Sequence, residues 1–65
     1  MKYAMVSESN HKDFEEALNN RIHSIEYPPN QTYYRGEIVD IEIRTIVIKK
    51  DHYEYVKYIA IIKYN

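Results

Sequence analysis

Two long strand-forming runs near the carboxy-terminal end constrain the fold of this chain more than any other feature. Residues 37–48 and 53–64 are rich in β-branched and aromatic side chains, and a polar cluster at 49–52 separates them. The pattern predicts an antiparallel hairpin with strands at about 37–49 and 53–64. This hairpin accounts for nearly half of the protein.

The polar cluster also sets an expected register for the hairpin. A two-residue loop and a four-residue loop centred in residues 49–52 give the same pairing, in which Val39 faces Ile62 and Ile43 faces Tyr58. Side chains alternate between the two faces of a strand, so all these residues share one face. We expect that almost wholly apolar face to pack in the core.

The opposite face of the hairpin, called the outer face below, is only half polar. It is expected to carry Ile38, Ile46, Ile48, Ile59, Ile61, Tyr53, Tyr55, Arg44 and Lys57. A sheet face in water should be mostly polar, and each large apolar side chain left in water forfeits about 1.5 to 3 kcal/mol relative to burial. We therefore predict a homodimer or higher oligomer, with the five isoleucines, Arg44 and Lys57 at its interface.

The length of the chain also favours oligomerisation. A domain of 65 residues buries only about 60% of the surface that its unfolded form exposes, and the absence of cysteine excludes disulfides as extra support. Nine basic and ten acidic residues give a net charge of −1, which disfavours nucleic acid as a partner. No apolar run is long enough to cross a bilayer, so we expect no membrane partner and a cytoplasmic location.

The amino-terminal half predicts a short strand at about 2–7 and a helix at about 11–26. Ser9 or Asn10 supplies an N-cap, and Pro28 ends the helix. The helix carries one stripe with spacings of three and four that is expected to pack on the sheet, formed by Phe14, Ala17, Leu18, Arg21, Ile22 and Ile25.

Residues 27–36 form the one long connection, which we expect to be a loop. Tyr33, Tyr34 and Arg35 lie in it, and rigid aromatic side chains on a proline-stiffened segment suit the binding of a partner or ligand. The competing interpretation, which we weight more heavily, is a linker whose tyrosines cover the open end of the core. Tyr53 and Tyr55 complete the set of candidate binding residues.

The predicted order of elements is β-α-β-β, which gives a single α+β domain with one helix on one face of a three-stranded sheet. The first strand can be a parallel neighbour in a right-handed crossover, or it can pair antiparallel with the last strand. We favour the second arrangement, because the apolar run at 59–62 suits a central strand.

No constellation of residues indicates catalysis, so we predict a protein that is not an enzyme and holds no cofactor or metal. His11 and His23 lie about 18 Å apart along the predicted helix, too far to share an ion within one chain. Asp40 and Glu42 share the outer face with Arg44 and Lys57, so cross-strand ion pairing is the better account than a catalytic pair of carboxylates.

Three segments resemble a family of tiny Gram-positive and phage proteins typified by a sporulation-expressed protein of unknown function. They are residues 13–19 (DFEEALN), 38–41 (IVDI) and 58–64 (YIAIIKY). The resemblance implies no activity. The element order is also similar to that of dodecins, which store flavin, but the chain has no Trp to stack on a flavin, so flavin binding is not carried over.

Three functions remain open on the sequence. The first is a non-enzymatic homo-oligomer that binds another protein, such as a phage or mobile-element inhibitor of a host defence protein. The second is a protein that sequesters a small nucleotide-like ligand, with tyrosines stacking on its ring and Arg35, Arg44 or Lys57 contacting its phosphate. The third is a sporulation-associated protein with a structural role.

Overall fold

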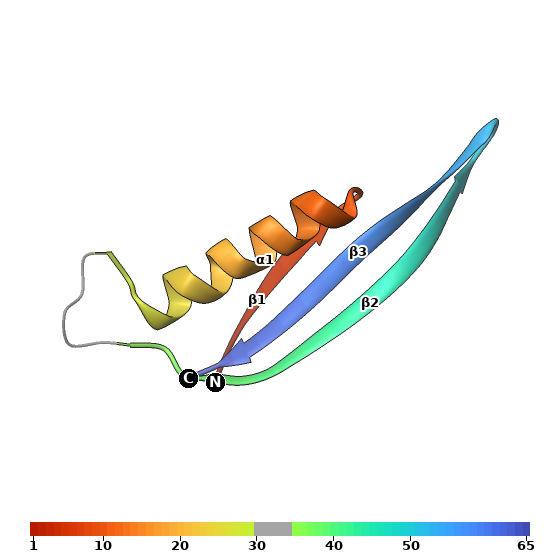
Figure 1. Ribbon diagram of the computed structural model, residues 1–65. Coiled ribbons are helices and arrows are strands. Elements are labelled where there is room, and N and C mark those ends of the chain that lie inside the picture. The colour runs from red at the N-terminus through yellow and green to blue at the C-terminus, as the bar shows by residue number, and fades with distance from the viewer. Residues whose placement is uncertain (30–34) are drawn as a thin grey trace.

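The computed structural model describes residues 1–29 and 35–65 of the chain. One helix lies along one face of a three-stranded sheet (Figure 1). The elements are β1 (Lys2–Glu8), α1 (His11–Glu26), β2 (Ile38–Lys50) and β3 (Tyr53–Tyr64). These bounds differ from the predicted ranges by at most one residue. The predicted α+β architecture is confirmed.

The strands follow the order β1-β3-β2, and both pairings are antiparallel. β3 is therefore the central strand, as the apolar run near its end predicts. The antiparallel pairing of the first and last strands is confirmed, and the parallel crossover is excluded for this chain. β2 forms one edge of the sheet.

The register of the β2–β3 hairpin differs from the prediction by two residues. Val39 was expected opposite Ile62, but Ile41 takes that position, and the strands are joined through Asp51 and His52. Because side chains alternate with a period of two, a two-residue shift keeps each side chain on its expected face. The apolar pattern alone does not distinguish the two registers.

Charge favours the register that the structure shows. Lys49 lies opposite Glu54, with 3.9 Å between Nζ and Oε1. The expected register would have placed Arg44 directly opposite Lys57, and like charges at such positions are destabilising. The shift removes that repulsion and creates an attractive pair.

An irregularity at Val39 moves one predicted outer-face residue to the other side of the sheet. The β2–β3 register changes between Ile38 and Asp40, so one extra residue is inserted there. Val39 is 47% exposed, whereas Ile38 packs against the core. The sequence prediction that Ile38 lies on the outer face is therefore wrong.

The helix begins and ends where local chemistry requires it. The Oδ1 atom of Asn10 accepts hydrogen bonds from the backbone N–H groups of Lys12 and Asp13, at 2.8 and 3.3 Å, which makes Asn10 the N-cap. At the other end, the Tyr27 N–H donates to the carbonyl of His23 at 2.8 Å, and Pro28 follows.

The core lies between α1 and the two strands that it covers, β1 and β3. Its buried side chains are Ala4, Val6, Phe14, Ile25, Ala60 and Ile62. Ala17, Leu18 and Ile22 are partly buried and pack against this core, so the predicted helix stripe is confirmed at its apolar positions. Arg21, the one charged member of the stripe, is exposed.

The face of the sheet toward α1, called the inner face below, is covered at Ile38 and Ile41 of β2 but not along the rest of that strand. Ile43 and Val47 were expected in the core, yet each is 57% exposed. A helix is about 10 Å wide and neighbouring strands lie about 4.8 Å apart, so one helix covers two strands and not three. The prediction that the whole inner face is buried is therefore wrong.

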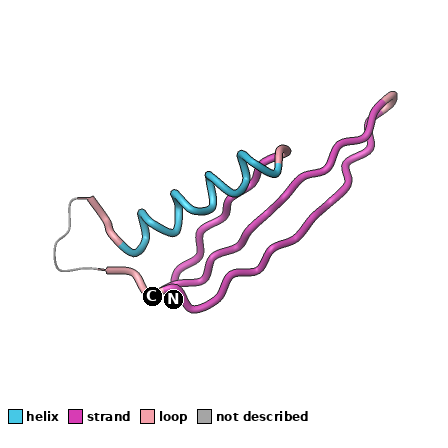
Figure 2. Tube along the Cα trace, viewed as in Figure 1, coloured by secondary structure: helices cyan, strands magenta, loops and turns pink. Residues whose placement is uncertain are grey.

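The hairpin extends past the helix as a two-stranded projection, called the arm below and formed by residues 46–57 (Figure 2). The aromatic rings of Phe14 and Tyr58 stack at 5.7 Å, which marks where the helix stops covering the sheet. The molecule measures 51 × 20 × 14 Å, with a radius of gyration of 14.2 Å. A compact chain of this length would have a radius of gyration of about 11 Å.

Candidate interaction surface

The outer face of the sheet carries a continuous band of apolar and aromatic side chains. Strand pairing places Met5 beside Ile61. Ala60 and Ile62, on either side of Ile61 in the chain, are fully buried on the inner face, so Ile61 and Met5 lie on the outer face. The same alternation extends the band across all three strands and into the arm. Its members are Tyr3, Met5, Ile46, Ile48, Tyr53, Tyr55, Ile59 and Ile61.

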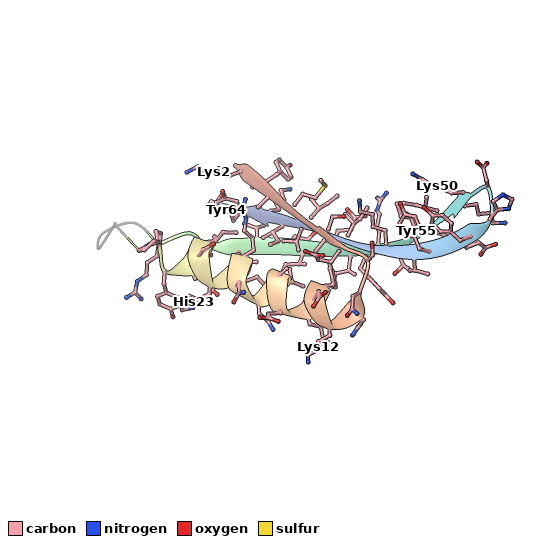
Figure 3. The ribbon with its side chains drawn as sticks, turned by 90° about the horizontal axis from the view of Figure 1, so that it is seen from above. Lys2, Lys12, His23, Lys50, Tyr55 and Tyr64 are labelled. Atoms are coloured by element: carbon pink, nitrogen blue, oxygen red, sulfur yellow. The ribbon has the colours of Figure 1, made fainter. Side chains whose placement is uncertain are left out.

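Exposure is unevenly distributed within this band. Tyr3, Met5 and Tyr53 are 65%, 66% and 60% exposed, and Ile46 is 40% exposed. The remaining members of the band are half-buried by their neighbours in the sheet. α1 lies on the opposite face, as the view from above shows (Figure 3), so no described element covers the band.

Tyr3 and Met5 are the members of the band that were not among the predicted interface residues. The sequence contained a signal for this, because Tyr3 and Met5 alternate along the strand with Ala4 and Val6. The structure buries Ala4 and Val6, so Tyr3 and Met5 lie on the outer face. Strand β1 pairs with the central strand rather than lying apart from it. The predicted surface therefore widens by one strand.

The charged residues of the outer face pair along β2 and not across the hairpin. Both Nε and Nη2 of Arg44 donate to the Oε1 atom of Glu42, at 2.8 and 2.6 Å. The two side chains are 65% and 50% exposed, so this ion pair contributes little to stability. Among the described residues no ion pair joins the charged side chains of the outer face across the hairpin, so the predicted cross-strand ion pairing is wrong, and Lys57 lies opposite Ile46.

The arm presents aromatic side chains in a defined arrangement. The rings of Tyr53 and Tyr55 lie 6.1 Å apart and 25° from parallel. Tyr55 and Lys50 both lie in the part of the hairpin beyond the helix (Figure 3). On the inner side of the arm, Val47 and Val56 are 57% and 37% exposed. The arm therefore exposes apolar groups on both of its faces.

The predicted loop site is only partly described. Tyr33 and Tyr34 lie outside the described residues. The guanidinium of Arg35 lies over the ring of Tyr27, with 5.1 Å between Cζ and the ring centroid, in cation–π geometry. Arg35 precedes Gly36, which bonds to the carboxy-terminal end of α1, while Tyr53 lies on the arm at the other end of the molecule. The structure does not bring Arg35 together with Tyr53 and Tyr55.

A pocket of about 300 Å³ lies between the carboxy-terminal part of α1 and the ends of β1 and β3. Lys2, Arg21 and Tyr64 are among its lining residues. Of the residues predicted to bind a ligand, the described ones, Arg35, Tyr53 and Tyr55, do not line it. The pocket therefore does not carry the ligand hypothesis drawn from the sequence.

The histidines take separate positions in the described chain. His11 lies edge-on to Tyr58, with ring centroids 5.4 Å apart, and its Nδ1 is 3.7 Å from a carboxylate oxygen of Glu15. Within residues 1–29 and 35–65, no three side chains of the metal-ligating types lie close enough to hold an ion. Among these same residues, no helix has the length and apolar character needed to span a membrane.

Comparisons with known proteins found no match to this chain among family models, curated proteins or solved structures.

Proposed function

We propose that this protein is a small non-enzymatic homo-oligomer that binds another protein, with the outer face as the contact between its own copies and the arm as the contact with the partner. The observation that carries the proposal is the one-sided cover of the sheet. α1 packs on the inner face only, and the outer face keeps its apolar band exposed. Exposed apolar patches of this kind mark interaction sites in proteins.

The size of the exposed surface supports self-association. The accessible surface is 5354 Å², whereas a compact monomer of 7.9 kDa is expected to expose about 4400 Å². The excess of about 900 Å² is close to the area of about 800 Å² that each partner buries in a standard protein interface. Burial of one interface of standard size would therefore bring the exposed area of each copy close to that of a compact monomer.

The arm supports the second half of the proposal. An isolated two-stranded hairpin is marginally stable in water, and this arm exposes apolar side chains on both faces without a third strand or helix beside it. Tyr53 and Tyr55 at its end provide the rigid aromatic contacts that dominate many binding interfaces. The arm would gain stability by docking on a partner.

The proposed setting is a phage or mobile-element inhibitor that engages a host defence protein. Its support is the small size and the Ile-, Lys-, Asn- and Tyr-rich composition of the chain.

A pull-down with a matched variant tests the binding function. Tagged wild-type protein, a Tyr53→Ala/Tyr55→Ala variant and a Lys12→Ala/Glu16→Ala control are each incubated with host lysate. Lys12 and Glu16 are exposed on α1, away from the sheet. We expect wild type and control to retain one host protein at near-stoichiometric amounts and the arm variant to lose it.

Native mass spectrometry of the protein purified from the host supplies the opposing outcome. A stoichiometric small molecule that survives purification, without a retained protein, would contradict protein binding and favour the ligand-sequestering function. If the arm variant retains the partner as well as wild type does, the partner binds at a surface other than the arm.

A further inference from the structure

The free edge of β2 offers a second contact for self-association that is independent of the outer face. Within the described chain, β2 pairs with β3 on one side only, and with 13 residues it is the longest strand of the sheet. An edge strand presents unpaired backbone N–H and C=O groups that suit another strand. The edge is also uncovered on the inner side beyond Ile41, where α1 leaves Ile43 and Val47 exposed.

We propose that β2 pairs antiparallel with β2 of a second copy, about a two-fold axis that passes through Thr45, to give a continuous six-stranded sheet. The inference deepens the proposed self-association by naming a contact and its register. A two-fold axis perpendicular to the sheet keeps inner side chains on the inner face in both copies. Residues that face each other across the two copies then both have odd numbers or both have even numbers. The residue on the axis lies opposite its own copy.

The regular part of β2 selects the position of the axis. The irregularity at Val39 interrupts the ladder, so uninterrupted pairing is available from Asp40 to Lys50. Thr45 is the midpoint of this eleven-residue stretch, and an axis there pairs every one of its residues. An axis at any other residue leaves part of the regular edge unpaired.

In this register two pairs are complementary, whereas the others off the axis set an isoleucine opposite a charged residue, as at Ile41 and Lys49. Ile43 of each copy faces Val47 of the other, which brings together the two 57%-exposed side chains that α1 leaves uncovered. Asp40 faces Lys50, so each end of the ladder gains a pair of opposite charges. Directly opposed apolar or oppositely charged residues on neighbouring strands lie about 4.5 to 5.5 Å apart at Cβ and stabilise the pairing.

Registers centred on Arg44, Ile46 and Val47 are less favourable for identifiable reasons. An axis at Arg44 places the two copies of that residue opposite each other, and an axis at Val47 places Arg44 opposite Lys50. Both arrangements set like charges face to face, which is destabilising. An axis at Ile46 removes the contact between Ile43 and Val47, the two most exposed apolar residues of β2.

The chain contains no cysteine, so a single introduced thiol reports this register directly. Thr45 is exposed on the edge strand, and in the proposed dimer Thr45→Cys brings two thiols within the Cα separation of about 4.4 to 6.8 Å that a disulfide requires. Ile43→Cys is the matched control on the same strand and face. Its two copies would be four residues out of register, about 14 Å apart.

Both variants are oxidised with a glutathione redox couple at micromolar protein and analysed by non-reducing electrophoresis. We expect Thr45→Cys to form a covalent dimer in at least tenfold excess over Ile43→Cys. Equal cross-linking of the two variants, preferential cross-linking of Ile43→Cys, or no cross-linking of either would overturn the proposal.

The same measurement in an Ile46→Glu/Ile59→Lys background separates this contact from the outer face. Ile46→Glu faces Arg44 of the second copy in the proposed register, so the change does not oppose edge pairing. Persistence of the Thr45→Cys cross-link in this background supports edge pairing whether or not the outer-face contact exists. Loss of the cross-link there would show that the edge contact does not form by itself and would overturn its independence.

Discussion

Gly36 lies just before β2 and packs closely against the carboxy-terminal end of α1. We therefore expect Gly36→Ala to destabilise the fold. The Gly36 N–H donates to the Ile25 carbonyl at 2.9 Å. A Cβ atom at this position would lie 2.5 Å from Cγ2 and 2.7 Å from the carbonyl oxygen of Ile25. Ile25 is 8% exposed, and its carbonyl accepts that same hydrogen bond, so neither atom can move away freely.

The magnitude follows from two opposing effects. Overpacking of this kind costs about 1 to 3 kcal/mol. Gly36 does not have a positive φ, so alanine adds no backbone strain and recovers about 0.4 to 1 kcal/mol through the unfolded chain. The net loss is about 1 to 2 kcal/mol, from a total stability of about 3 to 10 kcal/mol for 65 residues. The midpoint of thermal unfolding should fall by roughly 5 to 15 °C.

Urea denaturation at one fixed protein concentration measures this loss, because self-association makes stability depend on concentration. Glu37→Ala is the control. Glu37 is the exposed neighbour of Gly36, and its backbone bonds with Asn65, at 3.0 and 3.2 Å, do not involve its side chain. Unchanged or increased stability of Gly36→Ala, with the control unchanged, would refute the close approach of this segment to α1.

Three further changes test the helix and the loop. Asn10→Ala should cost about 1 kcal/mol in urea melts because it removes the N-cap acceptor; no loss would show that the helix does not begin there. Leu18→Ala should cost about 2 kcal/mol, the lower end of the range for truncating leucine, because Leu18 is partly buried; a loss below about 1 kcal/mol would place it outside the core. Replacing Tyr33, Tyr34 and Arg35 together by alanine should weaken partner binding, measured by the pull-down, in a protein whose circular dichroism is unchanged. Full retention of the partner would remove the loop from the binding surface.

Much of the fold was predictable because several local signals agreed. The helix stripe, the N-cap at Asn10 and the strand runs each indicate the same elements, and the apolar run near the end of β3 indicates its central position. Local propensity and hydrophobic period are sufficient where an element is long and has one buried face. These signals do not determine which residues form the hairpin loop or how many strands the helix covers.

The errors have specific physical causes. The register prediction failed because apolar alternation is equally satisfied by a two-residue shift. Only the charged pairs distinguish the alternatives, through the attraction of Lys49 and Glu54 and the repulsion that Arg44 would meet opposite Lys57. Ile38 changed face because the irregularity at Val39 adds a residue to β2, and no glycine or proline in that strand indicates it. Exposure at Ile43 depends on how far the helix reaches across the sheet, which periodicity does not encode.

The sequence predicted that the outer face is apolar, but it did not predict every residue of the candidate surface. The excess of apolar residues on one hairpin face followed from alternation, and the pairing places the predicted interface residues other than Ile38 on that face or its arm. Tyr3 and Met5 joined the surface once β1 was paired with β3. The sequence placed Tyr3 and Met5 on one side of the first strand, but the register that sets Met5 beside Ile61 came from the structure.

Sedimentation equilibrium of wild type and an outer-face variant tests the central claim most directly. Ile46→Glu and Ile59→Lys together place two charges in the apolar band of the outer face, on neighbouring strands. At micromolar concentration, wild type should sediment as a dimer or larger assembly. The variant should lose the outer-face contact and sediment at a lower mass while keeping its circular dichroism spectrum. A monomeric wild type, or a variant whose mass equals that of wild type, would contradict self-association through the outer face.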